Sequence, residues 1–167
     1  MSAEVTSLSQ KPTTRSPWML VPPPLLFALA FGLGMVLHRS LPLPLLPGAL
    51  ASLSRWLGVA LIGLGASLAL GCVALFARQR TTIIPHDRAR TLVTFGPYRV
   101  TRNPMYVGLT LVYLGVAVLT NTLWPVPFLA LPLWVLQTRV IPFEEQTLTQ
   151  VFGSQYTAYA ARVRRWL

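Results

Sequence analysis

Residues 103–138 read NPMYVGLTLVYLGVAVLTNTLWPVPFLALPLWVLQT and include no Asp, Glu, Lys or Arg in 36 positions. One helix of this length would extend about 54 Å, whereas the hydrocarbon core of a bilayer is about 30 Å thick. The polar triplet at residues 120–122 lies at the middle of the run, and Pro125 follows it closely. The run therefore predicts a helical hairpin of two short membrane spans, at residues 104–120 and 123–140.

Two shorter charge-free runs precede the hairpin, at residues 16–37 and 56–77. Each is close to the ~20 residues that a helix needs to cross a bilayer, and we expect spans at 17–38 and 53–78. The proline triplet at residues 22–24 places the start of regular helix at its first proline or later. The chain is 53% hydrophobic and only 11% charged. We expect an all-α membrane protein with about four transmembrane helices, including a C-terminal helical hairpin.

The cations are distributed unevenly between the two sides of these spans. Twelve of the 14 Lys and Arg residues fall on the side of both termini and of the loop at 78–103, and the others are Arg39 and Arg55. By the positive-inside rule this side faces the cytoplasm. We expect the membrane to be a bacterial inner membrane. Sidedness thus accounts for the net charge of +10, and nucleic acid is not an expected partner. We expect residues 1–16 to form a mobile cytoplasmic arm that is not cleaved, and residues 17–167 to form a single membrane domain.

The second predicted span is rich in glycine and alanine, which favour close packing against a neighbouring helix. An alternative is that Gly63 and Gly65 leave room for a ligand, because a glycine backbone admits close contact. The single cysteine, Cys72, lies in the same span and is expected to pack. The spacing of His38 and His86 resembles no metal site, so no metal is expected.

The reactive side chains lie in two cytoplasmic blocks, residues 81–106 and 139–166. Glu144 and Glu145 stand beside the apolar region, where a carboxylate normally has a partner or a functional role. Pro142 is expected to bend or end the helix just before them. Two interpretations stay open. Either Glu144 pairs with a nearby arginine and holds the helix ends, or both glutamates face the first block and line a pocket open to the cytosol and the bilayer.

Four motifs follow one another in these blocks: GPYR at 96–99, RNPMYVG at 102–108, EE at 144–145 and FGSQY at 152–156. In this order they resemble the integral-membrane methyltransferases that include isoprenylcysteine carboxyl methyltransferases and phospholipid N-methyltransferases. The resemblance covers residues 81–166 and implies that they are the catalytic half of a helical membrane enzyme. It also implies S-adenosylmethionine as cofactor, a cytoplasmic cofactor-binding loop, and a lateral opening to membrane lipids and an amphiphilic substrate.

The family pattern assigns site residues position by position. The resemblance implies that the cofactor is bound by Arg90, Thr91, Leu92, Val93, Tyr98, Asn103, Pro104, Met105, Tyr106 and Glu144. Glu144 would meet the cofactor's ammonium, while Tyr98 and Tyr106 would supply aromatic walls that favour its sulfonium. Gly63 and Gly65 resemble a glycine pair that phospholipid methyltransferases carry in an earlier span.

Two departures from the pattern bear on the methyl acceptor. Asn103 stands where prenylcysteine methyltransferases typically have His, and their arginine for a substrate carboxylate falls at Val140, one position after Arg139. We therefore favour a phospholipid amine, with a prenylcysteine-like carboxylate or another small apolar acceptor as alternatives. An amine must first lose a proton. The candidate bases are Glu145, Tyr106 and His86, and the candidate substrate contacts are Arg139, Arg99 and Arg102.

Apolar side chains recur at helical spacing over residues 144–166, with arginines at the end. This pattern predicts a C-terminal amphipathic helix that lies over the pocket or along the inner leaflet. Two other classes of function stay open: a non-catalytic membrane protein whose loop cations bind anionic lipid, and a nicotinamide-dependent membrane reductase, because membrane sterol reductases resemble this group at the C-terminal end. Binding of the cofactor separates the three classes.

Overall fold

A computed structural model describes residues 21–78 and 91–167 of the chain. In chain order these residues form α1 (Pro23–Ser40), η2 (Gly48–Leu50), α2 (Ala51–Arg78), η3 (Gly96–Arg99), α3 (Pro104–Leu119), α4 (Pro125–Phe128), α5 (Ala130–Val135), η4 (Leu136–Val140), α6 (Ile141–Phe152) and α7 (Ser154–Ala160), with no strand among them. Three helices are long and apolar enough to cross a membrane, and the shorter α3 is also apolar. The expected all-α membrane class is confirmed. The predicted arm at residues 1–16 lies outside the described residues.

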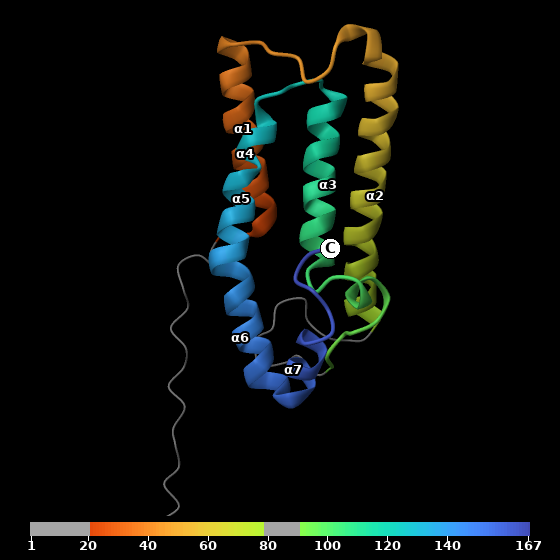
Figure 1. Cartoon of the computed structure of the whole chain (residues 1–167), viewed down its shortest axis with the longest axis vertical. Helices are drawn as coiled ribbons and strands as arrows, with labels where there is room; N and C mark the ends of the chain where they lie inside the picture. The colour runs from red at the N-terminus through yellow and green to blue at the C-terminus, as the bar shows by residue number, and fades with distance from the viewer. Residues whose placement is uncertain (1–20, 79–90) are drawn as a thin grey trace, which may run out of the picture.

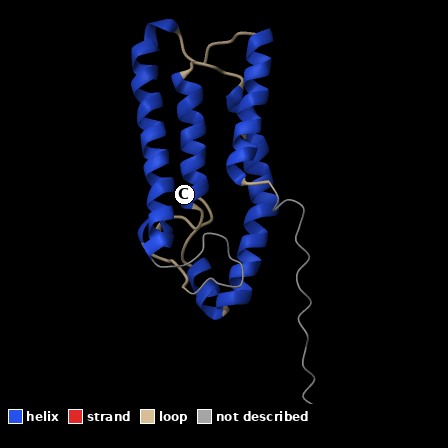
Figure 2. Cartoon of the chain, turned by 180° about the vertical axis from the view of Figure 1, so that it is seen from behind, coloured by secondary structure: helices blue, strands red, loops and turns tan. Residues whose placement is uncertain are grey.

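The helices stand side by side in two groups, α2 with α3 and α1 with α4 and α5, as Figures 1 and 2 show from opposite sides. The connection at residues 41–50 and the turn at 120–124 lie together at what we call the linker end (Figure 1). The loop at 91–103, α7 and residues 161–167 lie at the opposite end, which we call the tail end (Figure 1). All the described residues of the two predicted reactive blocks belong to α3, to η4 and α6, or to the tail end.

Paired glycines bring α2 and α3 into backbone contact. A Cβ atom added to Gly65 would lie 2.5 Å from the carbonyl oxygen of Gly108, and one added to Gly115 would lie 2.9 Å from that of Gly58. Because the pairs are seven residues apart on each antiparallel helix, they form one seam along the bilayer. Helix packing, the first interpretation of these glycines, is confirmed for Gly58 and Gly65. Gly63 has no atom within 4 Å of an added Cβ.

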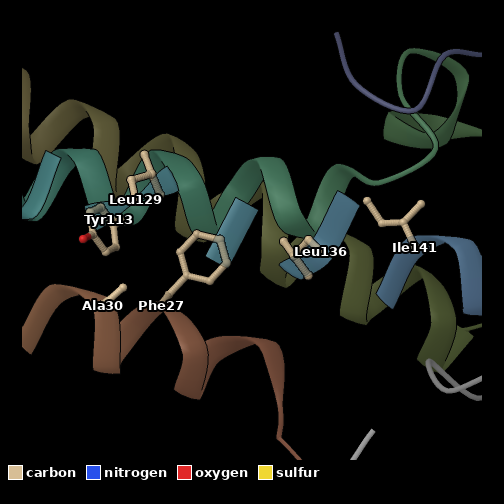
Figure 3. Packing of buried hydrophobic residues seen from close by; sticks show 6 residues of the cluster. All are labelled: Phe27, Ala30, Tyr113, Leu129, Leu136 and Ile141. Carbon is tan, nitrogen blue, oxygen red and sulfur yellow. The ribbon is translucent and has the colours of Figure 1, made fainter. Parts of the chain in front are cut away.

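Aromatic and aliphatic side chains join α3 to the other helix group. Figure 3 shows Phe27 and Ala30 of α1 facing Tyr113 of α3, with Leu129 close by. The rings of Phe27 and Tyr113 meet edge to face at 6.0 Å, and the Tyr113 hydroxyl donates to the Pro125 carbonyl over 2.7 Å. This contact gives the buried phenol the partner that it needs and fixes the start of the fourth apolar helix against α3.

The hairpin turn is tied to the proline-rich connection at the linker end. Asn121 has a positive φ of 50°, which ends α3 and turns the chain. Its side chain accepts from the Leu46 amide over 2.8 Å and donates to the Leu46 carbonyl over 3.1 Å. The predicted hairpin is confirmed, with α3 ending at Leu119 and α4 beginning at Pro125.

The fourth apolar helix continues from Pro125 to Phe152, past the point where Pro142 was expected to bend or end it. Residues Leu136–Val140 form one wide π-helical turn, in which the Ile141 amide donates to the Leu136 carbonyl five positions earlier. Proline has no N–H, and its ring crowds the carbonyl four residues before it. A wide turn just before Pro142 accommodates this crowding and lets the helix go on.

The C-terminal segment differs from the single amphipathic helix expected over residues 144–166. α6 ends at Phe152, Gly153 turns the chain with φ 53° and ψ −125°, and α7 is only seven residues long. This backbone conformation is open to glycine and strained for other residues. Residues 161–167 then run back to the base of α3, where the C-terminus lies (Figure 1).

Candidate functional site

Tyr98 anchors the loop at 91–103 to three other elements. It is buried together with Cys72 of α2 and Val93, and its backbone carbonyl accepts a 2.7 Å hydrogen bond from the Tyr159 hydroxyl of α7. Burial raises the pKa of the Tyr98 hydroxyl above its usual range, and the neighbouring Cys72 and Glu144 raise it further. The phenol therefore stays protonated at neutral pH, and it lies near the Glu144 carboxylate.

The two adjacent glutamates of α6 have different partners. Glu144 accepts a 2.6 Å hydrogen bond from the Tyr106 hydroxyl. Glu145 binds Arg165 through both carboxylate oxygens, at 2.9 and 2.6 Å, and also lies 3.0 Å from Arg102. These hydrogen bonds raise the pKa of the Arg165 guanidinium, which stays charged. Among the described residues, only Glu145 of this pair forms a salt bridge.

This division follows from helix geometry. Consecutive residues on an α-helix point about 100° apart, so neighbouring carboxylates reach different parts of the molecule. Glu144 points to α3, and Glu145 points to the tail and the loop at 91–103. The arginine pairing expected as one alternative for Glu144 is thus made by Glu145 instead. Glu144 is left as a partly buried carboxylate whose bonded partner is a neutral hydroxyl.

Asn103 and the two residues after it begin α3 beside these groups. The Asn103 side chain does not cap the helix but donates to the Arg165 carbonyl over 3.0 Å, and its amide donates to the Thr101 hydroxyl over 3.2 Å. Pro104 is fully buried, and Met105 packs on the cluster of Tyr98. The loop, the start of α3 and the tail are therefore one hydrogen-bonded unit.

The structure gathers most of the predicted site residues at the tail end and separates some of them. Val93, Tyr98, Met105, Tyr106 and Glu144 are linked as described above. Further out, the side chains of Thr91, Arg99 and Arg139 are exposed, and that of Leu92 is half-buried. The predicted site residues Arg90 and His86 lie outside the described residues.

Three residues of this end carry contacts that the sequence patterns did not single out: Thr101, Arg165 and Trp166. Thr101 is buried and donates to the Arg165 carbonyl over 2.8 Å. The Trp166 indole donates to the Gln137 side chain over 2.8 Å. The cluster of arginines near the C-terminus was visible in the sequence. Because residues 144–166 were interpreted as one helix, the return of residues 161–167 toward α3 was not predicted.

The chemistry of this end suits a ligand with an amino-acid group. Glu144 offers a partly buried carboxylate that forms no salt bridge with the described residues, and the negative charge of such a group is costly unless it is paired. The Nε atom of Arg102 is buried and has no hydrogen-bond partner among the described residues, so it is a free donor for an anion. Tyr98 and Tyr106 supply aromatic surface close to Glu144.

The sequence of this chain is similar to those of known methyltransferases. The family model described as Phospholipid methyltransferase matches residues 53–155. Protein-S-isoprenylcysteine O-methyltransferase B of Arabidopsis thaliana is 35% identical over 109 residues, which cover 64% of this chain and 55% of that protein. A probable protein-S-isoprenylcysteine O-methyltransferase of Oryza sativa subsp. indica is 33% identical over 115 residues, which cover 67% of this chain and 60% of that protein.

The chain thus spans little more than half the length of the curated relatives that it matches. No solved structure matches the chain significantly. The family model covers well over half of the chain, including the α2–α3 seam and the helix that carries Glu144 and Glu145. The protein belongs to the phospholipid methyltransferase family of integral-membrane proteins.

Proposed function

We propose that this protein transfers a methyl group from S-adenosylmethionine to the carboxylate of an S-prenylated cysteine or a similar amphiphile. The names of the curated relatives favour this acceptor over the phospholipid amine that the sequence analysis placed first. The proposed catalytic half is residues 81–166, within a single membrane domain at 17–167. In this proposal the tail end and both termini face the cytoplasm.

The observation that carries the proposal is the partner of Glu144. Its carboxylate is held at 2.6 Å by the Tyr106 hydroxyl and has no salt bridge among the described residues, whereas Glu145 has two. A charge that is oriented but not neutralised is suited to the ammonium of an amino-acid ligand. When bound, S-adenosylmethionine supplies such an ammonium together with an electrophilic methyl group on a sulfonium.

Other residues of the tail end complete the proposed cofactor site. The free Nε donor of Arg102 suits the cofactor carboxylate. Asn103 and Pro104 are proposed as neighbouring contacts only, because the Asn103 amide already donates to Thr101 and proline has no N–H. Tyr98 and Tyr106 suit the sulfonium and the adenine through their ring faces. The remaining proposed contacts are Arg90, Thr91, Leu92, Val93 and Met105.

The work left to the protein is mainly alignment of the two reactants. A carboxylate acceptor is already ionised at neutral pH and needs no base, so the rate depends on how well it is positioned. We assign Glu145 to holding Arg102 and Arg165 rather than to proton transfer. The exposed Arg99 and Arg139 are the candidates for drawing an acidic headgroup toward the site from the membrane surface.

A second candidate is a phospholipid amine, which the name of the matching family favours. An amine must be deprotonated before it attacks, so this acceptor requires one of the candidate bases Glu145, Tyr106 or His86. The membrane in which the protein resides stays a prediction, since the relatives are plant proteins and the sequence analysis expected a bacterial inner membrane.

One assay separates these proposals. Purified protein in nanodiscs is incubated with methyl-labelled S-adenosylmethionine and either an N-acetyl-S-prenylcysteine or phosphatidylethanolamine. A carboxyl methyl ester releases labelled methanol in alkali, whereas a methylated amine does not. We expect alkali-labile label with the prenylcysteine; alkali-stable label in lipid would establish the amine instead. A folded protein that does not bind the cofactor would contradict both, and displacement by a nicotinamide cofactor would indicate a reductase.

A further inference from the structure

The tail at residues 161–167 fastens the start of α3 through its backbone. The Arg164 carbonyl accepts from the Arg102 amide over 2.8 Å, and the Arg165 carbonyl accepts from Thr101 and Asn103 at 2.8 and 3.0 Å. Thr101 and Asn103 are only 3% and 9% exposed, so these hydrogen bonds satisfy polar groups that water does not reach.

The side chain of Arg165 fastens α6 at the same point. It reaches both oxygens of Glu145 in a two-pronged contact, and Arg102 approaches one of these oxygens from the loop. Arg165 therefore bonds α6 with its guanidinium and the residues before α3 with its carbonyl. A planar guanidinium makes this paired contact, and a lysine ammonium cannot reproduce it.

Trp166 adds a third attachment next to Arg165. Its indole donates to Gln137 in the π-turn, and the ring packs on the cluster of Phe27, Leu136 and Ile141. Three consecutive tail residues thus bind the loop, α6 and the π-turn in succession. The tail therefore connects the start of α3 to α6 through hydrogen bonds.

The proposed site depends on a contact between these same two elements, the hydrogen bond from Tyr106 of α3 to Glu144 of α6. Tyr106 is three residues after Asn103, whose carbonyl accepts its amide, and Glu144 is adjacent to Glu145. We propose that Arg165 is a positioning residue, which holds the Tyr106 hydroxyl and the Glu144 carboxylate in register for the methyl donor. This inference rests on the proposed function for the donor. The tail contacts of Arg164, Arg165 and Trp166, which we call the clamp, are a property of the fold.

The test compares Arg165→Met with Arg164→Met in nanodiscs. Both changes remove one positive charge from the tail and keep its backbone carbonyls. Arg164 is exposed, and its side chain forms no hydrogen bond or salt bridge with α6, so its variant is the matched control. Two readouts are taken on each variant: hydrogen exchange at the amides of Arg102 and Tyr106, and the dissociation constant for S-adenosylhomocysteine by calorimetry.

We expect Arg165→Met to speed exchange at both amides and to weaken ligand binding, each by about tenfold or more, because a hydrogen-bonded charge pair is lost. Arg164→Met should leave both values near those of the wild type. Arg165→Lys, which keeps the charge, should fall between the two and also serves if Arg165→Met does not fold. In a Glu145→Gln background, Arg165→Met should add little, since its partner is already removed.

The outcomes separate the clamp from the proposed function. Equal exchange and equal affinity in Arg165→Met and Arg164→Met would overturn the positioning role. If amide hydrogen exchange rises only in Arg165→Met and the wild-type protein binds no ligand, the clamp is supported and the methyl-donor site is contradicted.

Discussion

The α2–α3 seam and the tail end are both closely packed, but different atoms hold them together. In the seam, backbone atoms of Gly58 and Gly65 touch α3, with no side chain between them. At the tail end, polar side chains connect positions 38 to 62 residues apart in the sequence, such as Tyr106 with Glu144 and Asn103 with Arg165. The seam should therefore be intolerant of any added atom, whereas the tail end should be sensitive to charge and hydrogen bonding.

The largest expected effect is at the seam, in Gly65→Ala. The added Cβ would lie 2.5 Å from a backbone oxygen and 2.9 Å from the Cβ of Leu111, so the helices must separate. Overpacking of this kind costs about 1–3 kcal/mol or more. We expect a large drop in the thermal unfolding temperature in detergent.

Gly63→Ala is the matched control, because an added Cβ at Gly63 meets no atom within 4 Å. It makes the same chemical change two residues away and should alter stability by less than about 0.5 kcal/mol. Equal unfolding temperatures for the two variants would show that the seam is not what holds α2 and α3 together.

The next largest effect is expected at the tail end, in Glu144→Gln. This change nearly preserves shape but removes the charge proposed for the cofactor ammonium. A charge-assisted hydrogen bond contributes about 1.5–3 kcal/mol, which is an affinity loss of roughly 10- to 150-fold. Calorimetry with S-adenosylhomocysteine measures the affinity, and the unfolding temperature of the ligand-free protein should change little.

Glu145→Gln should affect stability more than ligand affinity, the reverse of what is expected for Glu144→Gln. It leaves Arg102 and Arg165 without their shared carboxylate, so the ligand-free protein should lose stability, with a smaller loss of affinity than in Glu144→Gln. If both variants bind ligand as the wild type does, the polar cluster is structural only and the proposed cofactor site is wrong.

The two regions also differ in how far they were predictable. The helix expected at 104–120 is Pro104–Leu119, because charge-free length and turn residues are local signals. The break at Gly153 and the returning tail were not predicted, since the contacts that stabilise them join residues distant in sequence. Tyr156 and Tyr159 lie at the apolar spacing of the expected helix and are buried, but burial alone does not distinguish one long helix from two short ones.

The π-turn at Leu136–Val140 bears on one of the sequence signals for the methyl acceptor. The expected carboxylate-binding arginine fell at Val140, one position after Arg139, which argued against a carboxylate acceptor. A π-turn contains one more residue than an α-turn and so rotates the preceding residues by about 100° relative to those that follow. Because the wide turn lies at this point of the helix, the offset of one residue is weak grounds for excluding a carboxylate.

A smaller effect is expected from Tyr106→Phe, which sharpens the distinction between charge and orientation at the tail end. The carboxylate of Glu144 remains, but it loses the 2.6 Å hydroxyl contact that directs it. We expect ligand affinity to fall by about tenfold, the lower limit for a hydrogen bond to a charged group. A loss as large as that in Glu144→Gln would mean that Tyr106 contributes more than orientation, and no loss would remove it from the proposed site.

The smallest effect on ligand binding is expected at the linker end, which lies opposite the proposed site, in Asn121→Ala. The change removes two side-chain hydrogen bonds to Leu46 and places a side chain other than Asn or Gly at a φ of 50°. Each lost hydrogen bond should lower the free energy of unfolding by about 1 kcal/mol, and the left-handed backbone conformation by a similar amount. Asn121→Gly is the control, since glycine keeps the backbone conformation while losing the same hydrogen bonds. The difference in stability between the two variants isolates the contribution of the backbone conformation.

Both variants should bind S-adenosylhomocysteine with the wild-type affinity, because hydrogen bonds at the linker end do not reach Glu144. A weakened affinity in Asn121→Ala at full folding would show that the two ends are coupled through α3, and that the seam transmits changes along the helix rather than only holding it in place.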